Sequence, residues 1–289
     1  MEQNDLLVRL QNQYPTLSKG QKQIASYIME NYDRAAFITA SRMGRMVGVS
    51  ESTVVRFAYE MGYDGYPALQ RALQEMIRTK LTAMQRIQLT SDMEQADVLR
   101  NVLKADMQNI RATVDTVDNE VFQGAMQAIL NAKKLYIVGM RSAYSIAQFL
   151  AYYLSFVLSD IVLINGAMSD ACEQMARIDE HDVCVAVSFP RYSTRTLEAI
   201  QYAKERCAGT VAITDAAASP LVPYADFALT ARSDMASFAD SLVAPLSLIN
   251  AMIVYAGLAR KDELMEHFDR LERIWGSHHV YVTKSRNNQ

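Results

Sequence analysis

The feature that most constrains the fold is a series of five short apolar runs in the second half of the chain. Longer segments with the apolar spacing of amphipathic helices separate these runs. The runs are LYIV at 135–138, IVLI at 161–164, VCVAVSF at 183–189, TVAIT at 210–214 and DFALT at 226–230. Parallel strands need long crossover connections, so strands that alternate with helices indicate a parallel sheet with helices on both faces. We therefore predict an α/β domain in this part of the chain.

The N-terminal part has a different pattern, because its apolar residues recur only at helical spacing. Between the two patterns, residues 92–132 are polar, free of proline and helical in period, and Asp118 is a suitable N-cap for the last helix. We predict an all-α domain at residues 1–78, a helical connector at 79–127, an α/β domain at 128–268 and a C-terminal tail at 269–289.

The charge of the chain is nearly balanced, at a net −3 for 289 residues. Residues 1–80 contain ten Lys and Arg against eight Asp and Glu, and the remainder contains 19 against 24. The positive excess of the first part is small, but it has the sign that a DNA-binding domain needs.

The three cysteines, Cys172, Cys184 and Cys207, are widely spaced and include no CxxC pair. This pattern predicts neither a disulfide framework nor a metal site, and no motif calls for a cofactor. The N-terminal residues are acidic and polar where a signal peptide would be basic and then apolar. We therefore expect a cytoplasmic protein.

One stretch, SLVAPLSLINAMIVYAGLA at 241–259, carries no charge over about the length of a membrane span. Pro245, Asn250 and several small polar or glycine positions argue against a span, as does the lack of aromatic and basic anchors at its ends. We predict instead a helix that is buried on nearly every side, partly in a contact between subunits, and no membrane partner.

A helix-turn-helix pattern lies at residues 39–61, which read TASRMGRMVGVSESTVVRFAYEM. Gly48 falls in the turn, where a positive φ is needed, and Ser50 with Thr53 provides capping oxygens for the second helix. The residues that account for the packing are Met46, Val49, Val54, Val55 and Phe57.

The outward positions of this motif carry the candidate DNA contacts. A recognition helix presents the side chains of its first turns to base edges and phosphates, and cations on neighbouring helices contact the backbone. Spacing alone leaves a small helical bundle with solvated arginines as an alternative. The candidate residues are Ser50, Glu51, Ser52, Thr53 and Arg56 on the second helix, with Arg42, Arg45 and Lys19 on the helices before it.

The whole N-terminal pattern resembles the head of the RpiR family of bacterial transcription regulators. The resemblance covers about residues 1–77 and rests on SKGQKQIASYIMEN followed by VSESTVVRFAYEMGYDGYPALQRAL. It implies DNA binding by residues 50–56. Gly62 and Gly65 would end the recognition helix and reverse the chain, with Tyr63 and Tyr66 packing that turn on the bundle.

In the second part of the chain, two of the predicted strands end in loops rich in hydroxyls and arginine. The first strand ends at Gly139 before a long helix, and the third ends in SFPRYSTRT at 188–196. Ligands of open parallel sheets bind beyond the carboxyl ends of the strands, where helix N-termini offer free N–H groups to anions. We predict an anion pocket whose charges and hydrogen bonds come from Arg141, Ser142, Ser188, Arg191, Ser193 and Thr194.

Serines at strand-to-helix junctions are also ordinary N-caps, and the residues alone leave this alternative open. A dinucleotide-binding Rossmann site is excluded on two grounds. No GxGxxG follows the first strand, and the second strand, IVLING, ends without an acidic residue to hold a ribose. A P-loop is absent from the sequence as well.

Residues 128–265 resemble a sugar isomerase (SIS) domain, the effector module that accompanies this head in the RpiR family. The first-loop pattern GxGxS is matched by Gly139, by Arg141 in place of the second glycine, and by Ser142. Later, AITDAAASPLVPYADFAL resembles the family's stretch from the fourth to the fifth strand. The resemblance implies a five-stranded parallel sheet flanked by helices that binds phosphorylated sugars at these loops.

The second SIS pattern, SxSGxT, is only partly kept. Ser188 and Ser193 retain hydroxyls, whereas Pro190 and Arg191 replace the inner Ser-Gly. We expect an arginine in place of glycine in each loop to remove backbone geometry suited to phosphate and to provide two guanidinium groups instead. A sugar phosphate, a sugar acid and another carboxylate all remain candidate ligands. Ser237 lies where SIS domains bring residues towards the ligand, and capping of the next helix is its alternative role.

An enzymatic role is not expected, because an SIS isomerase needs a Glu or His base beside the sugar carbons. The four histidines lie before a strand, at His181, or near the C-terminus, and Glu173 and Glu198 have no evident partner. The alternative is a sugar-phosphate isomerase, which would have no use for a DNA-binding head. A pure scaffold would leave both arginine loops unexplained.

We therefore predict a transcriptional regulator that binds a double-stranded DNA operator. A homodimer or homotetramer formed through the SIS domains would hold two heads at the spacing of operator half-sites. Binding of a small acidic ligand, such as a sugar phosphate or sugar acid, would change that spacing.

Overall fold

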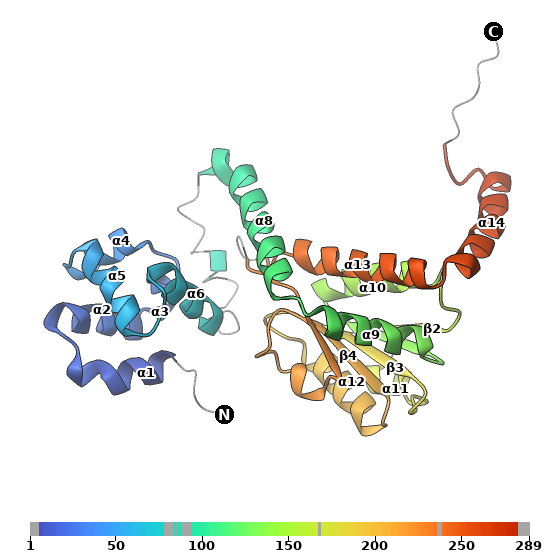
Figure 1. The fold of residues 1–289 in the computed structure, drawn as a ribbon, viewed down its shortest axis with the longest axis horizontal. Helices are drawn as coiled ribbons and strands as arrows, with labels where there is room; N and C mark the ends of the chain where they lie inside the picture. Colours follow the sequence, from blue (N-terminus) through green and yellow to red (C-terminus); the bar gives the residue numbers. More distant parts are fainter. Residues whose placement is uncertain are drawn as a thin grey trace, which may run out of the picture. The chain divides into compact units, whose positions relative to one another are not determined.

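The computed structural model describes residues 6–77, 84, 86–87, 94–166, 169–235 and 239–282. The chain divides into two compact units (Figure 1). One, here called the helical unit, contains residues 1–100 and 235–239, and the other, the sheet unit, contains residues 101–234 and 240–289. The boundaries that the sequence places at residues 78, 127 and 268 stay predictions.

The helical unit contains only helices among its described residues, as its apolar spacing predicted. Its core is formed by buried side chains that include Leu10, Ile24, Phe57, Leu69 and Leu73. The helices are α1 (Leu6–Gln13), the 3₁₀ turn η1 (Tyr14–Thr16), α2 (Lys19–Glu30), α3 (Tyr32–Ala35), α4 (Ala40–Val47), α5 (Glu51–Glu60), α6 (Tyr66–Ile77) and the 3₁₀ turn η2 (Gln95–Asp97).

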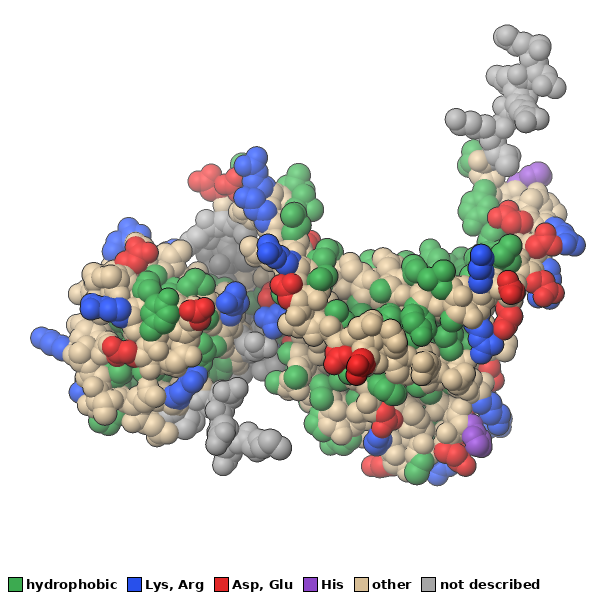
Figure 2. Space-filling view, viewed as in Figure 1, with side chains coloured by type: hydrophobic (Ala, Val, Ile, Leu, Met, Phe, Trp, Pro, Cys, Tyr) green, Lys and Arg blue, Asp and Glu red, His purple; other side chains and the backbone are tan. Residues whose placement is uncertain are grey.

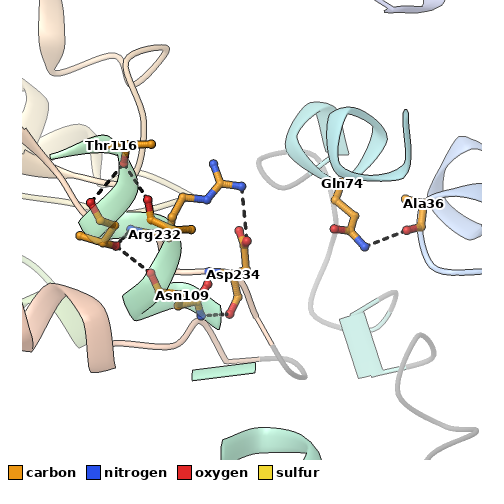
Figure 3. A network of polar contacts seen from close by, with 8 residues as sticks. Ala36, Gln74, Asn109, Thr116, Arg232 and Asp234 are labelled. Atoms are coloured by element: carbon orange, nitrogen blue, oxygen red, sulfur yellow. Dashed lines mark hydrogen bonds and ion pairs between the residues drawn. The ribbon is translucent and has the colours of Figure 1, made fainter. Parts of the chain in front are cut away.

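Side chains of α6 hold the segment between α3 and α4 in place. The Gln74 amide donates a hydrogen bond to the Ala36 carbonyl at 2.9 Å (Figure 3), and the Tyr66 hydroxyl donates one to the Ile38 carbonyl at 2.8 Å. Burial raises the pKa of the Tyr66 phenol, so the hydroxyl keeps its proton and remains a donor. These bonds satisfy backbone carbonyls between the helices and fix where α4 begins.

The sheet unit is built on five parallel strands, as predicted, and these strands lie in the order β2-β1-β3-β4-β5. Parallel pairing in register joins Val138 to Ile164 and Gly139 to Val187, so β1, β2 and β3 end side by side. The strands are β1 (Leu135–Gly139), β2 (Ile161–Ile164), β3 (Val183–Val187), β4 (Gly209–Thr214) and β5 (Phe227–Thr230).

Helices cover both faces of this sheet, which explains why the strands read as continuous apolar runs. Ile137 and Val185 face a core shared with α9 (Asn119–Asn131), α10 (Ser142–Leu154) and α13 (Val243–Ala259). Tyr136 and Cys184 face the opposite core, shared with α11 (Ala171–Gln174) and α12 (Thr194–Glu205). Figure 1 shows these two helical layers on either side of the strands.

Helix α8 (Val98–Thr116) precedes the sheet and connects to α9, where Asp118 is the N-cap and accepts hydrogen bonds from the N–H groups of Glu120 and Val121. The apolar spacing that predicted α8 does not mark a buried stripe. Met107 and Val114 are more than two-thirds exposed, whereas Asn109 and Thr113 are buried. Helix α8 therefore buries the polar side chains of Asn109 and Thr113 and leaves Met107 and Val114 outward.

Helix α13 is the apolar segment that the sequence predicted to be buried on nearly every side. That prediction is wrong for the single chain, because Val254 and Leu258 are 60% and 72% exposed. No single helix in the described part of the chain is long and apolar enough to cross a membrane. Among the helices that the structure describes, only α13 together with α14 (Lys261–Ser277) reaches the required length and composition, and the two are bent by 97° at their junction.

Candidate anion pocket and DNA-binding surface

The helix-turn-helix motif consists of α4 and α5 joined by a short turn. Gly48 has a φ of 74° and ends α4, as predicted, and the Ser50 hydroxyl accepts the Thr53 N–H at the start of α5. The need for glycine at position 44 was not predicted from the sequence. A Cβ added to Gly44 would lie 2.7 Å from the Val49 carbonyl oxygen, which is too close. The close approach of α4 to its own turn therefore depends on glycine.

The predicted packing of this motif holds for its centre but not throughout. Val54 and Phe57 are fully buried, and Val49 and Val55 are half-buried against the core. Met46 is 49% exposed, because the outward side of α4 carries it beside Arg42 and Arg45. The prediction that Met46 packs in the core is wrong.

The candidate DNA contacts lie on the surface of the helical unit. Thr53 is half-buried, and its hydroxyl and that of Ser52 both form hydrogen bonds with the Ser50 hydroxyl. These bonds make Ser50 chiefly a capping residue. The exposed candidates are Lys19, Arg42, Arg45, Ser50, Glu51, Ser52 and Arg56.

In the sheet unit, a pocket of about 830 Å³ lies beyond the carboxyl ends of β1, β2 and β3. In the sheet, β1 lies between β2 and β3. The chain passes from β1 to β2 and then crosses back to β3, and the pocket lies at this reversal of strand order. This is the switch point at which open parallel sheets bind their ligands. Gly139 ends β1 here, and a Cβ on it would lie 2.9 Å from both the Ala143 carbonyl oxygen and the Ala147 Cβ. Glycine thus lets α10 begin close to the strand.

The structure brings five of the predicted ligand residues to the pocket wall. They are Gly139, Arg141, Arg191, Ser193 and Thr194. Ser142 is exposed at the first residue of α10, and neither it nor Ser188 is among the residues that line the pocket. Ser237 lies outside the described residues.

Ser188 stabilises the loop after β3 through a hydrogen bond. Its side chain is buried, and its hydroxyl accepts a hydrogen bond from the Ser193 N–H at 3.2 Å. The backbone N–H of Ser188 itself donates to the Ile213 carbonyl at the end of β4. Ser188 therefore fixes the loop that presents Arg191, and a direct contact of its side chain with the ligand stays a prediction.

Several pocket residues were missed by the sequence reading. Asn165 and Gly166 directly follow the second predicted strand, and Arg195 stands in the quoted loop SFPRYSTRT, so position alone was a usable signal for all three. Tyr192 is held by a hydrogen bond from its hydroxyl to the buried Asp215 carboxylate at 2.7 Å. The missed lining residues are Met140, Tyr144, Asn165, Gly166, Tyr192 and Arg195.

Both loop arginines adopt backbone conformations that ordinarily require glycine. Arg141 has φ 58° and ψ −127°, and Arg191 has φ 60°. Both arginines therefore keep a positive φ of the kind that glycine usually adopts and add a guanidinium, and the expected loss of backbone geometry suited to phosphate stays a prediction. Such conformations cost about 1–3 kcal/mol each, and strain of this kind concentrates at functional sites.

Arg141→Gly is expected to raise the free energy of unfolding by about 1 kcal/mol and to weaken anion binding. Glycine relieves the strain at φ 58°, while loss of the guanidinium removes a charged donor. Urea unfolding and titration calorimetry measure the two effects. Arg141→Ala is the matched control, because it loses the charge but keeps the strain; equal stability of the two variants would contradict this account.

The electrostatics of the pocket favour an anion. Its described lining includes Arg141, Arg191 and Arg195 but no acidic side chain, and none of the three forms an ion pair with a described residue. The pocket also receives the N-termini of α10 and α12, whose N-caps, Arg141 and Ser193, make no side-chain capping bond. Free N–H groups at two helix starts and three guanidiniums converge on one space.

Comparison with known proteins identifies both units. Residues 4–80 match the model of the helix-turn-helix domain of the rpiR family, and residues 128–255 match the SIS domain. The chain belongs to the RpiR family of transcriptional regulators. The HTH-type transcriptional regulator HexR of Escherichia coli is 24% identical over 281 residues, which cover 93% of each chain.

Solved structures show the same fold. The sugar isomerase domain of an RpiR transcription factor from Sphaerobacter thermophilus is 24% identical with a TM-score of 0.59, and the match covers 61% of this chain and 99% of that one. The Vibrio vulnificus NanR protein, solved with ManNAc-6P, is 22% identical with a TM-score of 0.56, and covers 93% of this RpiR-family chain and 99% of its own.

Family membership confirms the prediction of a regulator with a helix-turn-helix and an SIS domain rather than an enzyme. The described pocket lining contains no His, Asp or Glu. His181 lies instead at the amino end of β3, on the opposite edge of the sheet.

Proposed function

We propose that this RpiR-family regulator binds its operator through α5 and that a small acidic ligand, a phosphorylated sugar, controls this binding from the SIS domain. The observation that carries the proposal is the pocket in which three arginines, none of them ion-paired with a described residue, meet two helix N-termini. A sugar phosphate in complex with the related NanR protein supports the same ligand class.

We assign operator binding to the exposed residues of the helix-turn-helix motif. Arg56 and Glu51 project from the first turns of α5, where a recognition helix meets base edges, and Ser52 lies beside them. Arg42 and Arg45 on α4 are placed for contacts to phosphates, which fix the register of the protein on the duplex without reading its sequence.

A second copy of the chain is the proposed occupant of the apolar surface along α8 and α13. Figure 2 shows hydrophobic side chains along the outer surfaces of these helices. Leu103, Met107 and Val114 on α8 and Val254 and Leu258 on α13 are all more than half exposed. An uncharged helix that exposes this much apolar surface is typical of an interface between subunits. A dimer formed in this way would present two heads to the half-sites of an operator.

Ligand control requires a physical link between the pocket edge of the sheet and the connector helix α8. The segment after β5 provides one, since it starts at the carboxyl edge of the sheet and its backbone is bonded to α8 (Figure 3). The Asn109 side chain donates to the Asp234 carbonyl at 3.0 Å and accepts the Asp234 N–H at 3.2 Å. The Thr113 hydroxyl accepts the Arg232 N–H at 2.9 Å. We call these contacts the α8 clasp.

Asn109→Ala is expected to uncouple ligand binding from DNA binding. The clasp consists of buried polar groups, which hold one arrangement only while all partners are present. We expect the ratio of operator affinities with and without ligand, about 5- to 150-fold in coupled systems, to fall towards one. Fluorescence anisotropy of labelled operator measures this ratio.

The matched control is Asn101→Ala, which removes an exposed asparagine from the same helix. It should leave the ratio unchanged, and both variants should retain the ligand affinity of the parent protein. An Asn109→Ala protein that still responds fully to ligand would show that the α8 clasp does not transmit the signal.

The proposed function is tested with the full chain and DNA from its own upstream region. A thermal-shift screen against sugar phosphates first identifies a stabilising ligand. Anisotropy titrations with and without that ligand then measure operator affinity, and sedimentation equilibrium measures the mass of the free and bound protein. Turnover of the sugar phosphate without binding to the DNA would refute the regulatory role.

A further inference from the structure

The pocket carries a third arginine that the two family loops do not account for. Arg195 is the second residue of α12, and its side chain lines the pocket with Asn165 and Gly166 from the end of β2. A Cβ built on Gly166 would lie 3.4 Å from Arg195 Nη1 and 3.7 Å from Met140 Sδ. The Arg195 guanidinium therefore reaches across the end of β1 to the end of β2.

The other two pocket arginines belong to the loops after β1 and β3. Arg141 and Arg191 stand in the loops that follow β1 and β3, beside the N-termini of α10 and α12. Ser193 and Thr194 at the start of α12 add hydroxyl and N–H donors there. The pocket thus has donors in the loops after β1 and β3, and a third guanidinium that reaches the residues after β2.

The positive charge of the three pocket arginines exceeds the negative charge of one phosphate group. Three arginines give the described lining a formal charge of +3, with no acidic side chain to offset it. A phosphate monoester carries about −1.5 to −2 at neutral pH, so one carboxylate more would bring the ligand close to the charge of the pocket. A volume of about 830 Å³ leaves room for a carbon chain between two acidic groups.

We propose that Arg195, with Asn165 and Gly166, forms a second acid subsite, and that the effector carries a carboxylate as well as a phosphoryl group. This inference rests on the proposed function, because it assigns the ligand class of the same pocket. The phosphoryl group is bound at the N-termini of α10 and α12 by Arg141 and Arg191. The carboxylate is bound by the planar guanidinium of Arg195, which pairs with two carboxylate oxygens at once.

The test uses probes without stereochemistry, so that an unsuitable sugar does not obscure the result. Linear phosphonocarboxylates with chains of about three to six carbons are compared with alkylphosphonates of the same length, by calorimetry on the full chain. We expect the best phosphonocarboxylate to bind at least about tenfold more tightly than its alkylphosphonate. Arg195→Gln should reduce this ratio to about twofold or less, because it weakens binding of the phosphonocarboxylate far more than binding of the alkylphosphonate, whereas Arg195→Lys should retain part of the ratio.

The control is Arg177→Gln, which removes an exposed arginine outside the pocket and should change neither affinity. Equal affinities for the two probe series at every length would overturn the second subsite, as would an Arg195→Gln protein that loses both series equally. Failure of the parent protein to bind inorganic phosphate and every probe would overturn the anion pocket itself, and with it the proposed function.

Discussion

Arg141→Ala combined with Arg191→Ala is expected to lower the affinity for a stabilising sugar phosphate by roughly 100-fold or more. Each charge-assisted hydrogen bond to an anion contributes about 1.5–3 kcal/mol, and the double variant removes two guanidiniums from one pocket. Alanine keeps the positive φ at both positions, so the comparison isolates the charges. Calorimetry measures the affinity, and anisotropy without ligand checks that operator binding is unchanged.

The matched control is the double variant Arg177→Ala with Arg206→Ala. Both arginines are exposed in the sheet unit, and neither lines the pocket. This control removes the same total charge and should bind the sugar phosphate as the parent does. If both double variants weakened binding equally, general electrostatic attraction rather than the pocket arginines would account for the affinity.

Arg56→Ala is expected to weaken operator binding by roughly ten- to hundredfold without altering ligand affinity. Arg56 is exposed on α5, within the turns that a recognition helix places in the major groove, and one such contact contributes about 1–3 kcal/mol. Anisotropy titrations at several salt concentrations measure the effect. A contact to phosphate lowers the salt slope by about one, whereas a contact to a base relaxes sequence specificity instead.

The control for this experiment lies on the same unit. Arg71 is exposed on α6, away from the helix-turn-helix motif in the sequence, and Arg71→Ala should change operator affinity little. If the Arg56→Ala protein bound the operator with wild-type affinity, the assignment of α5 as the recognition helix would be contradicted. The prediction that residues 50–56 contact DNA would then be wrong, although the fold of the motif would stand.

Parts of the candidate site could be predicted from the sequence, because parallel strands bring their carboxyl ends to the same edge of the sheet. Gly139, Arg141 and Arg191 were found in this way, and all three line the pocket. The hydrogen bond from the Ser193 N–H to the Ser188 hydroxyl, directly after β3, was not predicted, because sequence order does not show which way a side chain points. The sequence places Arg195 in the loop after β3, but its reach to the end of β2 depends on the position of α12 in the fold.

The sequence by itself determined the fold class, the strand segments and the helix-turn-helix motif, because local apolar period and capping residues decide them. Only the tertiary structure decided which side of each element is covered. In α8 and α13 the apolar spacing indicates helices, yet Met107 and Leu258 face outward while Asn109 is buried against the backbone of residue 234. The physical reason is that burial depends on partners distant in the chain, and local periodicity carries no record of them.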